Sequence, residues 1–175
     1  DFASIQADRI IAPSMINNWR QTRYCGKPHY LKEWAPSWLR DAYRLVSVPA
    51  SGKYAAIKRV HVSRERAASR RVVNETELTV LLKQHGFTCF HLEALPLREQ
   101  IELFSGIDML VAPHGAGLIN MSYCAKPIKM LEIYPNQYHD SSYRIQAKLL
   151  GHHYDFCIGE PPQADRGRTQ DQDLV

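Results

Sequence analysis

Residues 108–123, D-M-L-V-A-P-H-G-A-G-L-I-N-M-S-Y, constrain the fold of this chain more than any other stretch. Residues 109–112 form a short apolar run bounded by Asp108 and Pro113, which predicts a strand buried on both faces. A glycine turn follows at 114–117, and residues 118–123 can continue as a helix. Glycines let the backbone approach a ligand, and the first N–H groups of a helix are unpaired. The stretch therefore predicts a site for a phosphate-bearing ligand.

The spacing of the turn leaves two interpretations open. Gly115-x-Gly117-x-x-Asn120 is similar to a dinucleotide-binding fingerprint in which asparagine replaces the third glycine. On spacing alone, a phosphate site and a plain tight turn are equally good interpretations. The oxyanion loop of lipases is a weaker comparison, because it requires a G-x-S-x-G elbow that this sequence lacks.

Composition narrows the class of protein. The 175 residues suffice for one domain with a real core, or for one domain plus an appendage. The net charge of +4 is mild, and it suits an anionic small molecule better than a nucleic acid. No apolar run reaches membrane-spanning length. The four cysteines form no C-x-x-C, so we expect them to be reduced and structural.

Two features concern the origin of the chain. It begins at Asp1 instead of methionine, so we expect a piece or a processed form of a longer protein. N-x-S/T sequons occur at Asn74 and Asn120, in segments assigned to a helix start and to the glycine turn. A glycan at either position would be disruptive. We therefore expect a compartment without N-glycosylation, the cytoplasm.

The first 56 residues differ from the rest of the chain. Tryptophans and tyrosines crowd residues 19–38 with two prolines among them, and a strand could end at 10–12. A helix is predicted after Pro36, with a buried face formed by Trp38, Ala42, Leu45 and Val46. We expect this aromatic segment to be core or interface more than a platform for sugar stacking. Residues 47–53 are expected to be a linker.

Regular alternation of strands and helices begins near residue 55. Strands are predicted at 55–62, 87–92, 109–112, 129–134 and 153–158. Between them, Asn74 can cap a helix with Glu77 as its capping-box partner, and further helices are predicted at 97–104, 118–123 and 141–150. The buried faces are expected at Leu78, Leu81, Leu82 and His85; at Leu97, Ile101 and Phe104; and at Tyr143, Ala147 and Leu150. This alternation predicts an α/β fold with a doubly wound, Rossmann-like parallel sheet.

Three domains or segments follow from these patterns. Residues 1–56 would be an N-terminal aromatic-rich segment and linker. Residues 57–159 would be the Rossmann-like domain, and 160–175 a polar tail.

Ligands of an open parallel sheet bind beyond the carboxyl ends of its strands, and three sets of candidate residues fall there. Arg64 follows the first strand and can present a planar fork to a diphosphate. The turn His114–Gly117 follows the third strand, and His114 could stabilise charge on a leaving group. Glu132 lies in the fourth strand, near where an acidic residue reaches ribose hydroxyls, although a buried structural glutamate is equally consistent. No metal-binding cluster is visible, because the histidines are scattered.

Several separated motifs occur in one order: V-S-R at 62–64, R-R-V-V-N-E-T-E-L at 70–78, L-E-A-L-P-L-R-E-Q-I-E-L-F at 92–104, V-A-P-H-G-A-G-L-I-N at 111–120 and L-E-I-Y-P at 131–135. This set resembles glycosyltransferase family 61, including bacterial members of the capsular-polysaccharide type. The resemblance covers about residues 57–150 and is weak before residue 56.

The resemblance implies the C-terminal, nucleotide-sugar-binding lobe of a GT-B glycosyltransferase, with inverting and metal-independent transfer of a sugar to a glycan acceptor. Carried over, Arg64 and the turn of His114, Gly115, Ala116 and Gly117 would hold the diphosphate. Asn120 would lie just beyond, and Glu132 would be a candidate for the ribose. No cofactor is implied apart from the nucleoside diphosphate sugar as substrate. The general base is not assigned: it could be absent, be Asp41 or another early residue, or come from a partner.

Two other functions stay open at this stage. The chain could be a non-catalytic nucleotide-binding or assembly module, which the short N-terminal region favours. A nicotinamide-dependent oxidoreductase is disfavoured, because Asn120 replaces the third glycine and the glycine turn follows the third strand instead of the first. An apolar crevice left by a missing lobe would be covered, so we expect self-association or a missing N-terminal lobe as partner.

Overall fold

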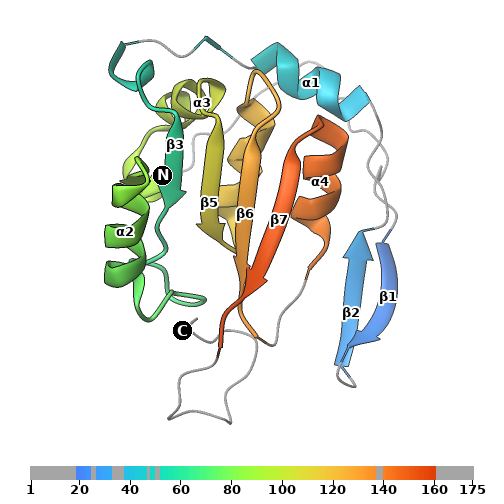
Figure 1. Ribbon diagram of the computed structural model, residues 1–175. Helices are drawn as coiled ribbons and strands as arrows, with labels where there is room; N and C mark the ends of the chain where they lie inside the picture. Colours follow the sequence, from blue (N-terminus) through green and yellow to red (C-terminus); the bar gives the residue numbers. More distant parts are fainter. Residues whose placement is uncertain are drawn as a thin grey trace, which may run out of the picture.

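A five-stranded parallel sheet forms the centre of the computed structural model, which describes residues 19–24, 27–32, 38–46, 48–49, 52–136 and 140–160. Its spatial order is β4-β3-β5-β6-β7 (Figure 1). The strands are β3 (Arg59–Val62), β4 (Thr88–Phe90), β5 (Met109–Pro113), β6 (Lys129–Tyr134) and β7 (His153–Ile158). All five predicted strands are present, and the predicted doubly wound α/β fold is confirmed.

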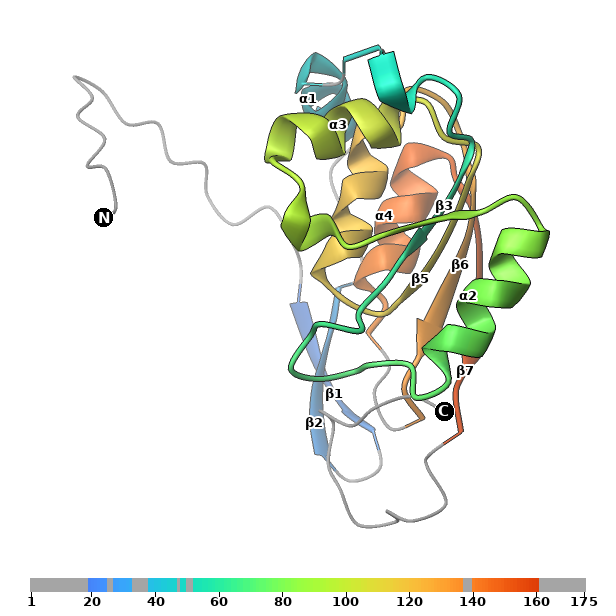
Figure 2. The same cartoon turned by 90° about the vertical axis from the view of Figure 1, so that its left-hand side faces the viewer.

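Helices cover both faces of the sheet. After β3 the chain forms α2 (Glu75–Gln84) on one face. The other face carries α3 (Leu97–Ser105), the 3-10 helix η3 (Ala116–Tyr123) and α4 (Ser142–Leu150) (Figures 1 and 2). Short 3-10 turns, η1 (Gly52–Tyr54) and η2 (Leu92–Ala94), precede β3 and follow β4. From β3 the chain steps outward to β4 and then returns past β3 to β5. The direction of winding therefore reverses between β3 and β5, which is where doubly wound sheets bind ligands.

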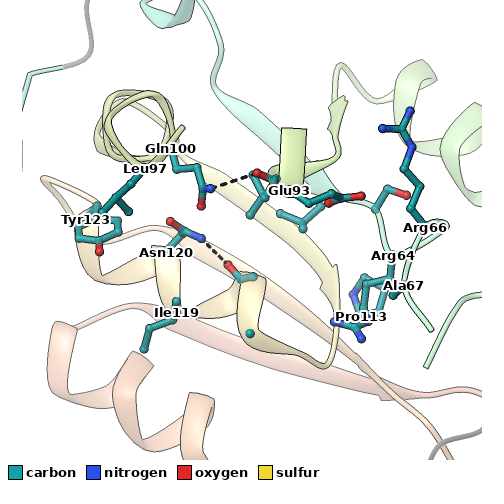
Figure 3. Close-up of a pocket in the computed structure, with 15 residues that line it drawn as sticks. Arg64, Arg66, Ala67, Glu93, Leu97, Gln100, Pro113, Ile119, Asn120 and Tyr123 are labelled. Carbon is teal, nitrogen blue, oxygen red and sulfur yellow. Dashed lines mark hydrogen bonds between the residues drawn. The ribbon is translucent and has the colours of Figure 1, made fainter. Parts of the chain in front are cut away.

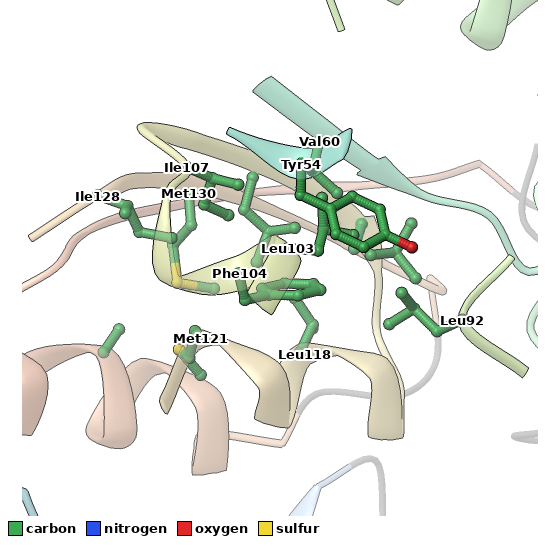
Figure 4. Close-up of a cluster of buried hydrophobic side chains, with 14 residues drawn as sticks. Tyr54, Val60, Leu92, Leu103, Phe104, Ile107, Leu118, Met121, Ile128 and Met130 are labelled. Atoms are coloured by element: carbon green, nitrogen blue, oxygen red, sulfur yellow. The ribbon is translucent and has the colours of Figure 1, made fainter. Parts of the chain in front are cut away.

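The larger core lies under α3, η3 and α4. Phe104 of α3 and Leu118 of η3 are fully buried against Val60, Leu110 and Met130 of the sheet (Figure 4). Every second strand residue contributes, because successive side chains of a strand point to opposite faces. Each large side chain buried in this way contributes about 1.5–3 kcal/mol. This core fixes η3, and with it the glycine turn, against the end of β5.

The smaller core lies under α2. Val72, Val111 and Ile133 are buried there, with Leu78 and Leu82 of α2 packed against them. Leu81 was predicted to share this face, but its side chain is 51% exposed, and His85 is also exposed. The helix is rotated from the predicted orientation because Glu75, in its first turn, is buried. The inward stripe is therefore 75, 78 and 82.

The ends of the helices agree in part with prediction. Gly86 and Gly151 have positive φ angles of 77° and 78°, and each follows a helix as the predicted stop. Asn74 stands at the N-cap of α2, but its side chain makes no capping hydrogen bond. The helix predicted at 118–123 begins at Ala116 and is 3-10, closed by bonds such as Leu118 N to Gly115 O. In α3, Ile101 is half-buried and Phe104 fully buried as predicted, but Leu97 is 61% exposed.

The N-terminal region contains an antiparallel hairpin that the sequence pattern did not predict. Strand β1 (Trp19–Tyr24) pairs with β2 (Lys27–Lys32), and only two residues separate them. The predicted helix is present as α1 (Trp38–Val46), but its predicted buried face is wrong: Leu45 is 87% exposed. The predicted strand end at 10–12 and the tail beyond residue 160 lie outside the described residues. Among the described helices, none is both long and apolar enough to span a membrane.

Candidate functional site

Arg64 lies at the carboxyl end of β3, beside the point where the winding of the sheet reverses. Its backbone N–H donates to Glu75 Oε1 at 3.2 Å, and its Nη2 donates to Ser69 O at 3.1 Å. Its Nε is buried and has no hydrogen-bond partner among the described residues. Burial, together with the positive charge of Arg70, lowers the pKa of the Arg64 guanidinium. A cation that is desolvated and beside another cation needs an anion, so this environment suits a negatively charged ligand.

The glycine turn after β5 packs directly on this arginine. Gly115 has an extended backbone, with φ 160° and ψ 174°, which residues with side chains also adopt. Its lack of a side chain matters for a different reason: a Cβ at this position would lie 2.2 Å from Arg64 Nη1 and 2.9 Å from Cζ. A Cβ at Gly117 would lie 3.1 Å from Val62 Cγ1. Both glycines therefore allow the end of β5 to approach the end of β3.

A cavity of about 430 Å³ opens next to this contact. It lies between the ends of β3 and β5 and the helices α3 and η3 (Figure 3). One end carries Arg64 and Arg66, and the other carries Gln100 and Tyr123. Apolar side chains form much of the wall between them. The lining residues include Val62, Ser63, Leu92, Glu93, Leu97, Pro113, Ala116, Gly117, Ile119 and Asn120. The exposed Leu97 thus faces a cavity, which is why it is not buried in the core.

Asn120 and Ala116 also belong to this cavity, in different ways. Asn120 is buried, and its amide donates to Gly117 O at 3.1 Å, so it supports the shape of the turn. Ala116 is exposed and lies at the mouth. His114, Gly115 and Glu132 do not line the cavity. Gly115 packs against Arg64, which does line it.

His114 and Glu132 form a buried pair on the α4 side of the sheet. His114 Nδ1 lies 2.5 Å from Glu132 Oε1, and Tyr154 Oη donates to Glu132 Oε2 at 2.7 Å. The imidazole stacks on Tyr134, with ring centroids 5.2 Å apart. Glu132 is fully buried and both of its oxygens are engaged. Contact of Glu132 with a ribose stays a prediction; the described geometry makes it the partner that orients His114.

A second buried pair, His61 with Glu75, was not among the predicted site residues. His61 Nδ1 lies 3.1 Å from Val111 O, and a carbonyl only accepts, so this nitrogen carries a proton. His61 Nε2 lies 3.3 Å from Glu75 Oε1, within ion-pair distance. Burial would raise the pKa of Glu75, but hydrogen bonds from His61, Ser63 and the Arg64 backbone lower it. The one signal in the sequence was a histidine inside an otherwise apolar strand, V-H-V at 60–62.

Other predicted features lie elsewhere or stay untested. Asp41 is on α1, ion-paired with Arg40 and Arg44, and α1 lies at the opposite end of the sheet from the carboxyl ends of the strands (Figures 1 and 2). The three cysteines within the described ranges, Cys89, Cys124 and Cys157, are free. In the same ranges no group of three or more histidine, cysteine, aspartate or glutamate side chains could hold a metal ion. Metal-independent chemistry stays a prediction.

Comparison with known proteins agrees with the resemblance stated above and extends it. The family profile described as Glycosyltransferase 61 matches residues 6–131. The match therefore includes most of the N-terminal segment, where the quoted motifs gave only a weak resemblance, and it ends one residue before Glu132. Comparison with curated proteins found no match. Because the profile covers well over half of the chain, including β3, β5 and the glycine turn between β5 and η3, the chain belongs to glycosyltransferase family 61.

Proposed function

We propose that this chain is the donor-binding lobe of an inverting, metal-independent glycosyltransferase of the GT-B and capsular-polysaccharide type. The donor is a nucleoside diphosphate sugar and the acceptor a glycan or polysaccharide. Family membership supports glycosyltransferase activity in general. The observation that carries the finer proposal is Arg64 seated against Gly115 at the reversal point of the sheet, with an unpartnered Nε beside a cavity of about 430 Å³. That volume falls within the range of small-molecule sites.

In this proposal the diphosphate lies at the ends of β3 and β5. Arg64 donates to its oxygens, and the N–H groups of the glycine turn add further donors. The acceptor hydroxyl attacks the anomeric carbon while a base takes its proton, and the bond from that carbon to the diphosphate breaks. Charge that develops on the leaving diphosphate is stabilised by these fixed donors and by His114. The general base is proposed to come from outside the described site, because α1, which contains Asp41, lies at the other end of the sheet (Figure 1).

Glu132 has a positioning role in the same proposal. Its Oε1 accepts from His114 Nδ1, which fixes the orientation of the ring and the nitrogen that carries the proton. Tyr154 holds the second carboxylate oxygen. Burial and the neighbouring charge of Glu132 raise the pKa of Tyr154, so its hydroxyl stays protonated and remains a donor.

The organisation of the whole enzyme is also a proposal. Residues 1–56 would be the remnant of a first lobe, 57–159 the donor lobe, and 160–175 a polar tail. Trp38, Leu45 and Val46 of α1 are at least 48% exposed, which supports a packing partner such as a missing lobe or a second copy. We place the protein in the cytoplasm, and the buried Asn120 of one sequon is consistent with an absence of glycosylation there.

Calorimetry with UDP, GDP and CDP, first without metal and then with magnesium, tests the proposal. Binding of one nucleoside diphosphate without metal would support the assignment of a donor lobe and would identify the nucleobase of the donor. Binding that requires magnesium would contradict the metal-independent assignment. If no nucleotide binds, the chain alone is not a donor lobe. Tight binding of NADH in a fluorescence titration would instead favour an oxidoreductase, and nucleotide binding without donor hydrolysis or transfer would favour a non-catalytic module.

A further inference from the structure

A second pocket of about 330 Å³ lies at the carboxyl ends of β6 and β7, on the same face of the sheet as α4. It is separate from the cavity beside Arg64, and the two share no lining residue. Tyr134 and Tyr154 form one side together with Phe156 and Ile158 of the edge strand. Asp140, Ser141 and Arg144, at the start of α4, form the other. Strands β6 and β7 thus contribute aromatic rings to the pocket, and the segment at the start of α4 contributes polar side chains.

The aromatic wall of the pocket, formed by Tyr134, Tyr154, Phe156 and Ile158, is partly exposed to solvent. Phe156 is 50% exposed and Ile158 is 48% exposed. The ring of Phe156 packs edge-on against Tyr134, with centroids 5.9 Å apart and planes at 84°, and lies 6.4 Å from the ring of Tyr154. Two neighbouring rings therefore hold Phe156 in place while half of its surface contacts no part of the described chain. An exposed aromatic side chain fixed in this way is ready to contact a ligand with little loss of conformational freedom.

The polar side of the pocket limits what that ligand is. The Arg144 guanidinium is exposed and makes no hydrogen bond or ion pair with the described residues, so its donors can reach a ligand. A purely apolar ligand would accept no hydrogen bond from Arg144. A pyranose ring matches both sides, because its C–H face is apolar and its hydroxyl groups lie around the rim. The C–H groups pack on the negative face of an aromatic ring, and the hydroxyls exchange hydrogen bonds with Arg144 and Ser141.

The pocket is connected to the proposed catalytic region by hydrogen bonds. Tyr154 Oη lies 3.3 Å from Tyr134 Oη and donates to Glu132, which in turn binds His114. The ring of Tyr134 also stacks on His114. A ligand on this wall would therefore lie beside the pair that the proposed mechanism uses.

We propose that the pocket formed by Tyr134, Tyr154, Phe156 and Arg144 binds a pyranose ring of the acceptor glycan. The assignment of that ring to the acceptor rests on the proposed function; the assignment of a sugar to the pocket rests on the aromatic wall and Arg144 alone. A donor sugar has the same ring chemistry, so the experiment has to separate the two sources.

Amide chemical shifts of the full chain, measured by NMR, make this test. The chain is titrated separately with methyl glycosides of glucose, galactose, xylose and N-acetylglucosamine, with UDP, and with UDP-glucose. We expect at least one methyl glycoside to shift the resonances of β7 and the start of α4, and UDP alone to leave them unchanged. Shifts of β7 with UDP-glucose but with no methyl glycoside would assign the pocket to the donor sugar and overturn the acceptor assignment. Shifts with UDP alone would place a nucleobase there and overturn the proposal.

Three variants give the test its controls. Phe156→Ala should weaken the binding of that glycoside about 5-fold, from loss of ring contact. Phe156→Leu keeps apolar bulk without an aromatic face and should weaken it similarly. Leu81→Ala, which removes an equally exposed side chain from α2 on the other face, should change nothing. Full glycoside affinity in both Phe156 variants, or no response of β7 to any glycoside, would overturn the proposal. UDP affinity, read from the resonances of residues 63–70, reports separately on the proposed function.

Discussion

Two buried histidine–glutamate pairs stand at the carboxyl ends of neighbouring strands, on opposite faces of the sheet. His61 and Glu75 lie on the α2 face at β3, and His114 and Glu132 lie on the α4 face after β5. Both glutamates are at least 93% buried, since Glu75 is 7% exposed and Glu132 fully buried. The two pairs contain the same residue types, but their glutamates accept hydrogen bonds from different second partners.

The difference lies in the second partner of each glutamate. Glu75 also accepts from the backbone N–H of Arg64, so the first pair fixes the loop that presents the arginine. Glu132 also accepts from Tyr154, so the second pair joins His114 to the aromatic pocket of β6 and β7. In His61 both ring nitrogens face partners inside the fold, Val111 and Glu75. The first pair therefore supports the loop of Arg64, and the second pair lies beside the aromatic pocket of β6 and β7.

Removal of either glutamate should give the largest effect on stability. Glu75→Ala and Glu132→Ala each break a buried pair, and we expect a loss of about 3–5 kcal/mol in the free energy of unfolding. Urea unfolding followed by circular dichroism measures it. Glu93→Ala, at an exposed position, is the control and should stay within about 0.5 kcal/mol of the wild type. Losses below 1 kcal/mol for both buried positions would contradict the pairing described here.

Gly115→Ala should show whether the position of Arg64 matters for the binding of UDP. The new Cβ would lie 2.2 Å from Arg64 Nη1, so the arginine must move out of its place. We expect the free energy of UDP binding to become less favourable by about 1.5–3 kcal/mol, the contribution of a charged hydrogen bond.

Gly52→Ala is the matched control for this variant. Its φ of 56° is unfavourable for alanine, but nothing lies within 4 Å of the new Cβ. We expect about 1 kcal/mol of lost stability and unchanged UDP affinity. Equal UDP affinity in Gly115→Ala and the wild type would show that the Arg64 position is unimportant for binding.

Double-mutant cycles on UDP affinity should assign each glutamate to its own partner. Glu75→Gln should couple to Arg64→Ala, and Glu132→Gln to His114→Ala, each by about 0.5–3 kcal/mol. The crossed pair, Glu75→Gln with His114→Ala, should couple by less than about 0.5 kcal/mol. Strong coupling of the crossed pair would mean that the two histidine–glutamate pairs act as one network through the sheet.

The smallest expected effect is the dependence of stability on pH. The pKa of Glu75 is lowered in the folded state, so its contribution is present above its ordinary pKa of 4.5 and is lost as the pH falls through the lower, folded value. Urea unfolding between neutral pH and acid should therefore show a steeper acid loss in the wild type than in Glu75→Gln. Identical slopes would show that Glu75 is not held ionised by its partners.

The sequence predicted the parts of the fold that follow from local pattern. The alternation of strand and helix patterns located all five strands, and the ends of β3 and β5 lie together at Arg64 and Gly115. The rotation of α2 could not be predicted, because it depends on the contacts of Glu75 with His61 of β3 and with the backbone of Arg64, which hydrophobic periodicity does not contain. The exposed face of α1 was also missed, since periodicity predicts an apolar face but not whether a partner covers it.

The candidate site was predictable to a similar extent. Strand order places residues at one edge of a sheet, so Arg64 and His114–Gly117 could be named from the sequence. The engagement of Glu132 by His114 and Tyr154 depends on side-chain orientation across two strand pairs. Such contacts are set by packing, which the order of residues along the chain does not reveal.

In the proposed function, Arg64 holds a diphosphate at the junction of β3 and β5. Calorimetry of the wild type and of Arg64→Ala, each with UDP and with uridine, tests it most directly because the two ligands differ only in the diphosphate. We predict that Arg64→Ala weakens UDP binding by about 1.5–3 kcal/mol and leaves uridine binding unchanged. An equal loss for both ligands, or no loss for UDP, would contradict the claim and remove Arg64 from the phosphate site.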